Sequence, residues 1–501
     1  MLLACARTRA REVRSADMSI LRHIACATPL VLLGVLAVVG AGRDDAEPLR
    51  DRSARASTVV GGVLDGATVG DDVACETASD GARHTLLVVA RPNDVPASRM
   101  PAARARLLRA VGVASAILDQ RAGELAPGRG ARIQVRCADG TPVVAEVTLA
   151  ASTREIQVGT IEHLLKAQLD AQGIDSRNAV VLMHLDADPF PNDVAIGGLA
   201  VVQRRGMARA GWFPTLHEWL HAMGALQDRR DGGAPNATPA GHCTDGLDVM
   251  CYDDRSSGRP QRLVCRERVV DCGGDDYFHP EPRAGSWLAT HPETNVARQA
   301  EWLDATSRGT LVAPTVRTIA RSSSTVRLTW AQDPAATGGY RVWRRDPVND
   351  AWVPSVLAVP GSTSADVRGL RNAFGGRAYV LRSAFRVEAI GAGGMTSPLA
   401  TAPSLRVPGV PRMTRPRVVS STRSTVTVAW DLPVGATDLA WVDVHRQTGF
   451  TDRRSAGRAR PVARRFTVRG LRPGTSYRIA LITRDAATNA STDAVVWART
   501  R

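Results

Sequence analysis

The sequence predicts an α/β (α+β) domain with a mixed sheet, followed by two all-β sandwiches. Between residues 84 and 222, apolar strand-like runs alternate with amphipathic helical stretches. From residue 311 onward, short alternating strands with Pro and Gly turns replace the helices. At 501 residues, the chain is also long enough to hold several domains.

The amino-acid composition favours packed domains and argues against a nucleic-acid-binding protein. Hydrophobic residues make up 44% of the chain, which is enough for ordinary cores. The formal net charge is +15, but almost every basic residue is arginine, and Lys166 is the only lysine. Because these arginines are scattered and not interleaved with aromatic residues, they form no nucleic-acid-binding stripe.

The N-terminal segment has the pattern of a secretory signal peptide, which we place at 1–41. A short basic region at 22–23 precedes an apolar run at 29–39 and a small-residue exit, and Met18 is an alternative start. Residues 42–70 are polar and Gly-rich, typical of a linker or a short pro-segment. We therefore expect a secreted, extracellular protein with no integral membrane span after cleavage; an uncleaved anchor is the alternative.

Six cysteines follow the signal peptide, and an even number in an exported chain indicates disulfides. They are Cys75, Cys137, Cys243, Cys251, Cys265 and Cys272. The last four cluster within thirty residues, so a bond between Cys75 and Cys137 is predicted, whereas the clustered four leave three pairings open. Zinc ligation by cysteines is the alternative, but no CxxC pair occurs.

The α/β domain is predicted to cover residues 71–308. Strands are expected at 84–90, 132–137, 143–149, 179–185 and 195–202, and helices at 100–124, 160–172 and 294–303. The strand containing Gly197 and Gly198 is a candidate exposed edge, with which an extended peptide could pair through backbone hydrogen bonds. The alternative is a plain edge strand loosened by glycine.

A helix closed by Gly224 carries the main chemical signal. His217 and His221 lie four residues apart, so both project from one helix face, where two imidazoles can hold a zinc ion. Glu218 between them can act as general base on a metal-activated water. The alternative is an ordinary half-buried helix, in which Thr215 and Glu218 form a capping box.

A second motif follows the helix. His217-Glu-x-x-His221-x-x-Gly224, followed by Asp248-Val-Met250-Cys-Tyr252, resembles the metzincin zinc endopeptidases. The resemblance implies one catalytic zinc, Glu218 as base, and a structural Met-turn with Met250 packed under the metal. It also implies that the Tyr252 hydroxyl stabilises the oxyanion. A plain packing role for Tyr252 is the alternative.

The third metal ligand departs from the family pattern. That position is Gln227 here, and an amide is a poor zinc ligand. We predict that His242 completes the site, with Asp228 as the alternative third ligand. Asp248 is a further substitute, although short polar residues in such turns are usually structural. Paired aspartates at 275–276 raise the possibility of calcium, but no EF-hand spacing supports it.

The tail is predicted to contain two sandwiches, at 311–408 and 411–501. Thr325–Trp330 in the first unit recurs as Thr425–Trp430 in the second, and both units resemble fibronectin type III domains. In the second unit, the segment ending at Tyr477 matches that family's tyrosine corner. Neither unit offers a catalytic constellation, so we expect spacing, adhesion, or binding of a surface or matrix ligand.

Together these features predict a secreted zinc-dependent endopeptidase that takes a protein or peptide substrate in extended conformation. The alternative is a non-catalytic cell-surface or matrix-binding protein that retains a degraded protease domain, a hypothesis supported by the missing standard third ligand. A third hypothesis is a zinc hydrolase that acts on something other than protein.

Overall fold

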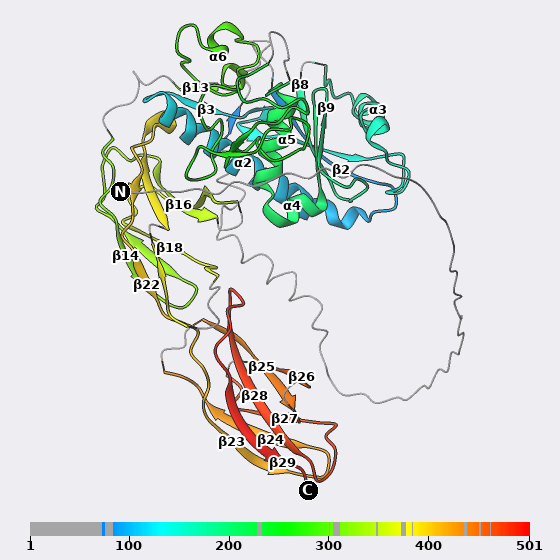
Figure 1. The fold of residues 1–501 in the computed structure, drawn as a ribbon, viewed down its shortest axis with the longest axis vertical. Helices are drawn as coiled ribbons and strands as arrows, with labels where there is room; N and C mark the ends of the chain where they lie inside the picture. Colours follow the sequence, from blue (N-terminus) through cyan, green and yellow to red (C-terminus); the bar gives the residue numbers. More distant parts are fainter. Residues whose placement is uncertain are drawn as a thin grey trace, which may run out of the picture. The chain divides into compact units, whose positions relative to one another are not determined.

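The structure is a computed structural model (Figure 1). It describes residues 73–75, 84–177, 179–227, 233–299, 301–303, 311–346, 349–371, 377–382, 384–434, 438–449, 452–460 and 462–501. The predicted signal peptide, the linker and Asp228 lie outside these residues. Contacts divide the chain into Met1–Asp51 and Arg52–Arg501, and the described residues all belong to the second unit.

The N-terminal part of this unit is built on a mixed sheet of seven strands. Their order is β1-β4-β2-β8-β10-β9, and β7 also pairs with β2. The strands are β1 (Ala74–Cys75), β2 (His84–Arg91), β4 (Gln134–Val135), β7 (Val144–Thr148), β8 (Ala179–Leu185), β9 (Val194–Ile196) and β10 (Leu199–Gln203). The central strands β2, β8 and β10 run parallel, whereas β9 is antiparallel to β10 and forms the edge.

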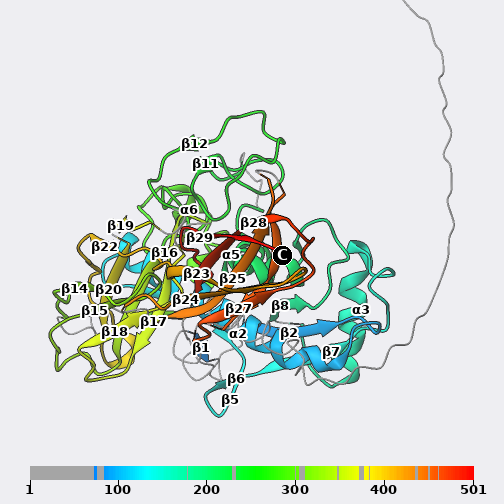
Figure 2. The same ribbon diagram turned by 90° about the horizontal axis from the view of Figure 1, so that it is seen from below.

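Helices cover both faces of this sheet (Figures 1 and 2). Helices α2 (Met100–Leu125) and α5 (Trp212–Ala222) share one apolar core with the sheet, and α3 (Val158–Ala171) packs into a separate core. Strand β2 alternates between the two cores because successive side chains point to opposite faces, with Leu87 in the first and Leu86 in the second. The predicted α/β sheet with covering helices is confirmed.

The predicted single strand at 195–202 is wrong. The segment is a hairpin in which β9 and β10 are joined through Gly197 and Gly198. Gly197 has φ +56°, a left-handed conformation that side chains disfavour, so the glycines make the turn rather than the edge. The exposed edge is β9, which contacts α5.

The predicted helix at 294–303 is also wrong. The segment forms a short 3₁₀ helix, η4 (Val296–Gln299), followed by strand β13 (Glu301–Leu303). β13 pairs antiparallel with β3 (Gly130–Arg132). Pairing with a strand distant in sequence therefore outweighs the local helical pattern. The predicted strand at 132–137 is likewise divided into short pieces, because β3, β4 and β5 (Cys137–Ala138) pair with different partners.

Three disulfides join the six cysteines that follow residue 70. Cys75–Cys137 was predicted and is confirmed. The open pairings resolve as Cys243–Cys251 and Cys265–Cys272. Because the six sulfurs are bonded in three pairs, none of these cysteines is available as a thiolate ligand.

Several short elements complete the α/β domain. They are η2 (Ala97–Arg99), β6 (Thr141–Pro142), α4 (Arg204–Ala210), β11 (Asp245–Gly246), β12 (Arg262–Leu263) and α6 (Trp287–Thr290). Among the described residues, no helix is both long and apolar enough to cross a membrane.

Two β-sandwiches follow, as predicted. The first pairs sheet β14-β15-β18 with sheet β17-β16-β20-β21, and the second pairs β23-β24-β27 with β26-β25-β28-β29. The first contains β14 (Arg317–Ala320), β15 (Val326–Thr329), β16 (Gly339–Asp346), β17 (Ala351–Ala358), β18 (Ser364–Val367), β19 (Tyr379–Leu381), β20 (Phe385–Ile390), η6 (Ala392–Gly394), β21 (Ala400–Thr401) and β22 (Leu405–Val407). The second contains β23 (Thr414–Ser421), β24 (Val426–Asp431), β25 (Leu439–Gln447), β26 (Arg454–Ala459), β27 (Arg465–Val468), β28 (Ser476–Asp485) and β29 (Ala494–Arg499). In the second, the Tyr477 hydroxyl accepts a hydrogen bond from the Arg472 backbone N–H, at 2.9 Å, as a tyrosine corner requires.

The first sandwich shares apolar core with the α/β domain. Trp343, Trp352 and Val353 are buried in the same cluster as the inner faces of α2 and α5. The Trp352 indole N–H donates to Glu267 at 2.6 Å, and the Arg268 backbone N–H donates to the Asp350 carbonyl at 2.8 Å. The predicted boundary near 308 therefore separates two folds but not two independent cores.

Candidate metal centre

Helix α5 carries the His217, Glu218 and His221 side chains on its cavity side. Leu216 and Leu220 are fully buried in the core and anchor the opposite side of the helix. The helix ends at Ala222, and Gly224 closes it as predicted, with a φ of +97° that glycine adopts without strain.

The capping-box alternative does not match this helix. Thr215 lies inside α5 rather than before its first turn, and its side chain is completely buried. Its hydroxyl has no hydrogen-bond partner among the described residues. Glu218 therefore does not cap the helix through Thr215.

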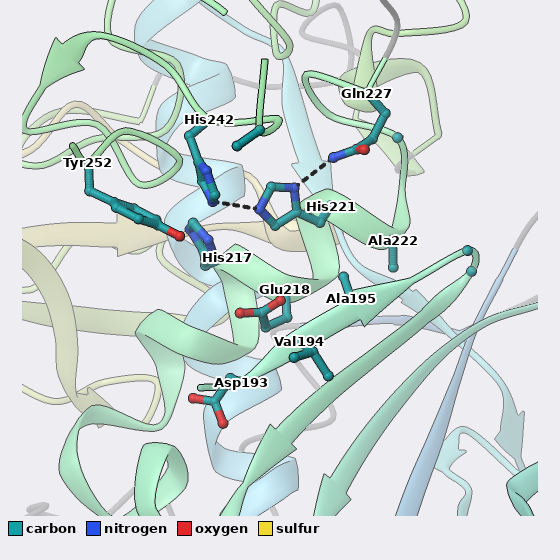
Figure 3. Close-up of a pocket in the computed structure, with 14 residues that line it drawn as sticks. Asp193, Val194, Ala195, His217, Glu218, His221, Ala222, Gln227, His242 and Tyr252 are labelled. Carbon is teal, nitrogen blue, oxygen red and sulfur yellow. Dashed lines mark hydrogen bonds between the residues drawn. The ribbon is translucent and has the colours of Figure 1, made fainter. Parts of the chain in front are cut away.

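The loop after α5 brings His242 to the two helical histidines (Figure 3). His242 Nε2 lies 3.3 Å from His221 Nε2, and the His217 and His242 rings are 5.5 Å apart. The Cys243–Cys251 disulfide lies directly beside His242 and restricts the loop. One ring nitrogen from each histidine falls within 4.8 Å of the others, so the three could hold a single metal ion.

Each of the three imidazoles has its other nitrogen engaged from behind. His217 Nδ1 faces the Val249 carbonyl at 2.9 Å, and His242 Nδ1 faces the Asp254 carboxylate at 3.0 Å. His221 Nδ1 faces the side-chain amide of Gln227 at 2.9 Å. Such outer partners orient metal-binding histidines, and the acceptors beside His217 and His242 also fix their tautomers, with the three Nε2 atoms left free to converge.

Burial keeps these imidazoles neutral. Desolvation lowers the pKa of His217 to about 4 and lowers the pKa of His221 further. The pKa of His242 is also lowered by burial, although Asp254 opposes the shift. Neutral imidazoles have a lone pair to offer, so the set has the chemistry of a nitrogen-ligand site for zinc.

Glu218 lies in a cavity of about 600 Å³ that the three histidines and Tyr252 also line. Burial raises the pKa of Glu218 to about 8, and the nearby Asp193 carboxylate adds to the shift. A bound cation would favour the ionised form and return the carboxylate to the range of a general base. Strand β9 supplies Val194 to the same cavity wall (Figure 3).

Tyr252 and Met250 occupy different environments. Tyr252 is 50% exposed, its ring lies 4.1 Å from the His242 ring, and its hydroxyl end is turned toward His217 (Figure 3). Met250 is fully buried in the core beneath the turn. Its backbone N–H donates to Asp248, at 2.7 Å, so Asp248 is engaged in holding the turn.

Among the described residues, neither Gln227 nor Asp248 contributes to the cluster of metal-ligand atoms formed by the three histidines. Gln227 lies behind His221, and Asp228 lies outside the described residues. Asp271, Asp275 and Asp276 gather their carboxylates within 4.8 Å, but backbone N–H groups of the same loop donate to Asp271. We therefore assign no calcium site to this acidic loop.

The sequence interpretation missed two partners, Asp254 and the Val249 carbonyl. Asp254 follows His242 by twelve positions, and this spacing has no motif that would have singled it out. Val249 contacts His217 through its backbone carbonyl, and because every residue has this group, the sequence offers no signal for it.

Comparisons with known proteins assign no family to the chain. No protein-family model matches it, and no curated protein matches it. Among solved structures, the chain is similar to a two-domain fibronectin type III segment from chicken tenascin, with 20% identity and a TM-score of 0.22. That match covers 38% of this chain and 99% of the other.

Proposed function

We propose that this protein is a secreted zinc-dependent endopeptidase of the metzincin type. The observation that carries the proposal is the set of three imidazoles, two buried and that of His221 half-buried, each contacted at Nδ1 by a partner and each turned with Nε2 toward the others. His217, His221 and His242 would hold the ion. The HExxHxxG and Asp248–Tyr252 motifs add the resemblance to this family.

The chain's own residues have matching roles in peptide hydrolysis. Zinc, when bound, supplies Lewis acidity that polarises a carbonyl and acidifies water. Glu218 takes a proton from the attacking water and passes it to the leaving amine, so one carboxylate serves as base and then as acid. Tyr252 extends its hydroxyl from the rim of the cavity toward the developing oxyanion.

Strand β9 is the proposed site of substrate binding. It is the edge of the sheet, its outer side adjoins the cavity, and Val194 and Ala195 line that cavity. An extended peptide that adds to this edge would run past Glu218 with its backbone paired and its side chains alternating. The proposed substrate is therefore an unfolded or loop segment of a protein.

The two sandwiches are proposed to be fibronectin type III-like modules that bind a surface or matrix ligand or space the protease from it. The described residues of both sandwiches contribute nothing to the lining of the cavity. Export is proposed from the N-terminal sequence pattern and agrees with the three disulfides.

Cleavage of casein or gelatin by the zinc-loaded full chain tests this proposal. Wild-type protein should cleave, a chelator should abolish cleavage, and Glu218→Ala should be inactive while still binding zinc. If zinc-loaded wild type cleaves no member of a peptide library, the protein is not an endopeptidase. Zinc binding without cleavage would then favour the non-catalytic binding protein or a hydrolase of another substrate class.

A further inference from the structure

The outer partner of His221 differs in kind from those of the other two histidines. The partners of His217 and His242 are a carbonyl and a carboxylate, which only accept hydrogen bonds. His221 Nδ1 instead faces the Gln227 amide, a group that has both a donor and an acceptor end. The Gln227 amide can therefore either donate a hydrogen bond to His221 Nδ1 or accept one from it.

Gln227 is an exposed residue, and its amide lies beside both His221 and Gly241. A Cβ atom on Gly241 would lie 2.8 Å from Gln227 Nε2, and Gly241 has φ +83°. Glycine suits this left-handed position, and its lack of a side chain leaves room for the amide beside the loop that precedes His242. Figure 3 shows Gln227 and His242 on opposite sides of the His221 ring, so the imidazole is held between them.

The chemistry of a nitrogen ligand explains why an amide suits this position. A neutral imidazole that binds a metal through Nε2 carries its proton on Nδ1, and that proton needs an acceptor. A half-turn of the Gln227 amide about its last carbon–carbon bond presents Oε1 in place of Nε2. The same side chain can thus serve His221 in either tautomer, which a hydrocarbon cannot do.

We propose that Gln227 is a positioning residue that orients His221 so that its Nε2 faces the point shared with His217 and His242. It acts through His221 and does not itself bind the metal. This inference rests on the metal site in the proposed function, but it concerns a residue whose amide is itself a poor ligand for zinc.

Zinc dissociation constants of the full chain, measured by competition with a chromophoric chelator, test the inference. Gln227→Met keeps the side chain's length but removes the hydrogen bond, and should weaken zinc binding by about 10- to 100-fold. Gln227→Glu keeps an acceptor and should bind zinc at least as tightly as wild type. Gln172→Met is the matched control, because the Gln172 amide donates to the Glu146 carbonyl outside the site, and it should leave zinc binding unchanged.

The visible spectrum of the Co²⁺-loaded protein separates a positioning role from direct ligation. In Gln227→Glu it should keep the wild-type band positions and intensities, since the ligands are the same three imidazoles. A changed spectrum in this variant would mean that position 227 enters the metal's ligand set, and would overturn the inference.

Two further outcomes separate this inference from the proposed function. If folded Gln227→Met binds zinc as wild type does, the positioning role is refuted while the three-histidine site stands. If Gln227→Met fails to fold, weaker binding by folded Gln227→Glu than by wild type refutes the role. If wild type itself binds no zinc, the proposed function and this inference both fail.

Discussion

A buried hydrogen bond joins helix α5, which carries His217 and His221, to strand β2. Trp219 lies on α5 between His217 and His221, and only 1% of its surface is exposed. Its indole N–H donates to the Thr85 hydroxyl on β2 at 2.8 Å, and Thr85 is also buried. Thr85→Val preserves the shape of the side chain but leaves the indole N–H without its acceptor. Because a buried donor without an acceptor is destabilising, this variant should lower the free energy of unfolding by about 1–3 kcal/mol.

The same substitution at Thr215 provides the matched control. The Thr215 hydroxyl is buried and has no hydrogen-bond partner among the described residues, so Thr215→Val removes a buried polar group without breaking a hydrogen bond. That change should leave stability unchanged or raise it by about 1 kcal/mol.

Urea unfolding of the full chain, followed by far-UV circular dichroism, measures both effects as shifts in the midpoint of the transition that involves the α/β domain. Thr85→Val should lower the midpoint and Thr215→Val should not. If Thr85→Val were as stable as Thr215→Val, the Trp219–Thr85 bond would not be holding the helix.

Three further predictions concern other parts of the molecule. Trp352→Ala should lower the free energy of unfolding by about 3–5 kcal/mol, because it leaves a cavity at a buried site. Trp497→Ala, at a side chain that is 67% exposed, should change it by less than about 0.5 kcal/mol. Thermal unfolding of the two variants compares these effects. Burial and the Asp271 charge raise the pKa of Asp276 from 3.8 to about 8, so the folded state keeps a proton that the unfolded state loses. Stability should therefore fall as pH rises through this range, and Asp276→Asn should flatten that slope in urea titrations at successive pH values; an unchanged slope would contradict the assignment. Tyr252→Phe should reduce kcat/KM on a cleaved peptide by about 100-fold with zinc affinity unchanged, and full activity would remove Tyr252 from the reaction.

The parts of the fold that the sequence predicted are those with local patterns. The apolar run at 84–90 and the helical spacing at 100–124 became β2 and α2, because burial on one sheet face imposes a simple periodicity. The spacing of His217 and His221 placed two ligand candidates on one face for the same reason. The disulfide Cys75–Cys137 could be predicted because the other four cysteines cluster far along the chain, within thirty residues of one another.

The errors arose where distant segments decide the structure. Residues 195–202 have the apolar character of one strand, but the left-handed Gly197 folds them into a hairpin whose first strand becomes the edge. Residues 301–303 extend because β3 offers them a pairing partner. Neither partner is visible in the local sequence.

The three histidines that gather at the candidate site were singled out from the sequence, but the groups that orient them were not. His242 could be proposed from residue type and from its place beside Cys243. Its orientation depends on Asp254, and that of His217 depends on a backbone carbonyl, so both come from tertiary structure. The position of Gln227 was noted for what it lacks as a ligand, whereas its contact with His221 appears only in three dimensions.

The location of bound zinc tests the central claim most directly. An anomalous-difference map at the zinc edge, from crystals of the full chain loaded with one equivalent of zinc, would show where the ion sits and which atoms hold it. We predict one peak, about 2.0–2.1 Å from the Nε2 atoms of His217, His221 and His242. A peak that excludes His242, or that is held by Gln227 or Asp228 in its place, would contradict the three-histidine site.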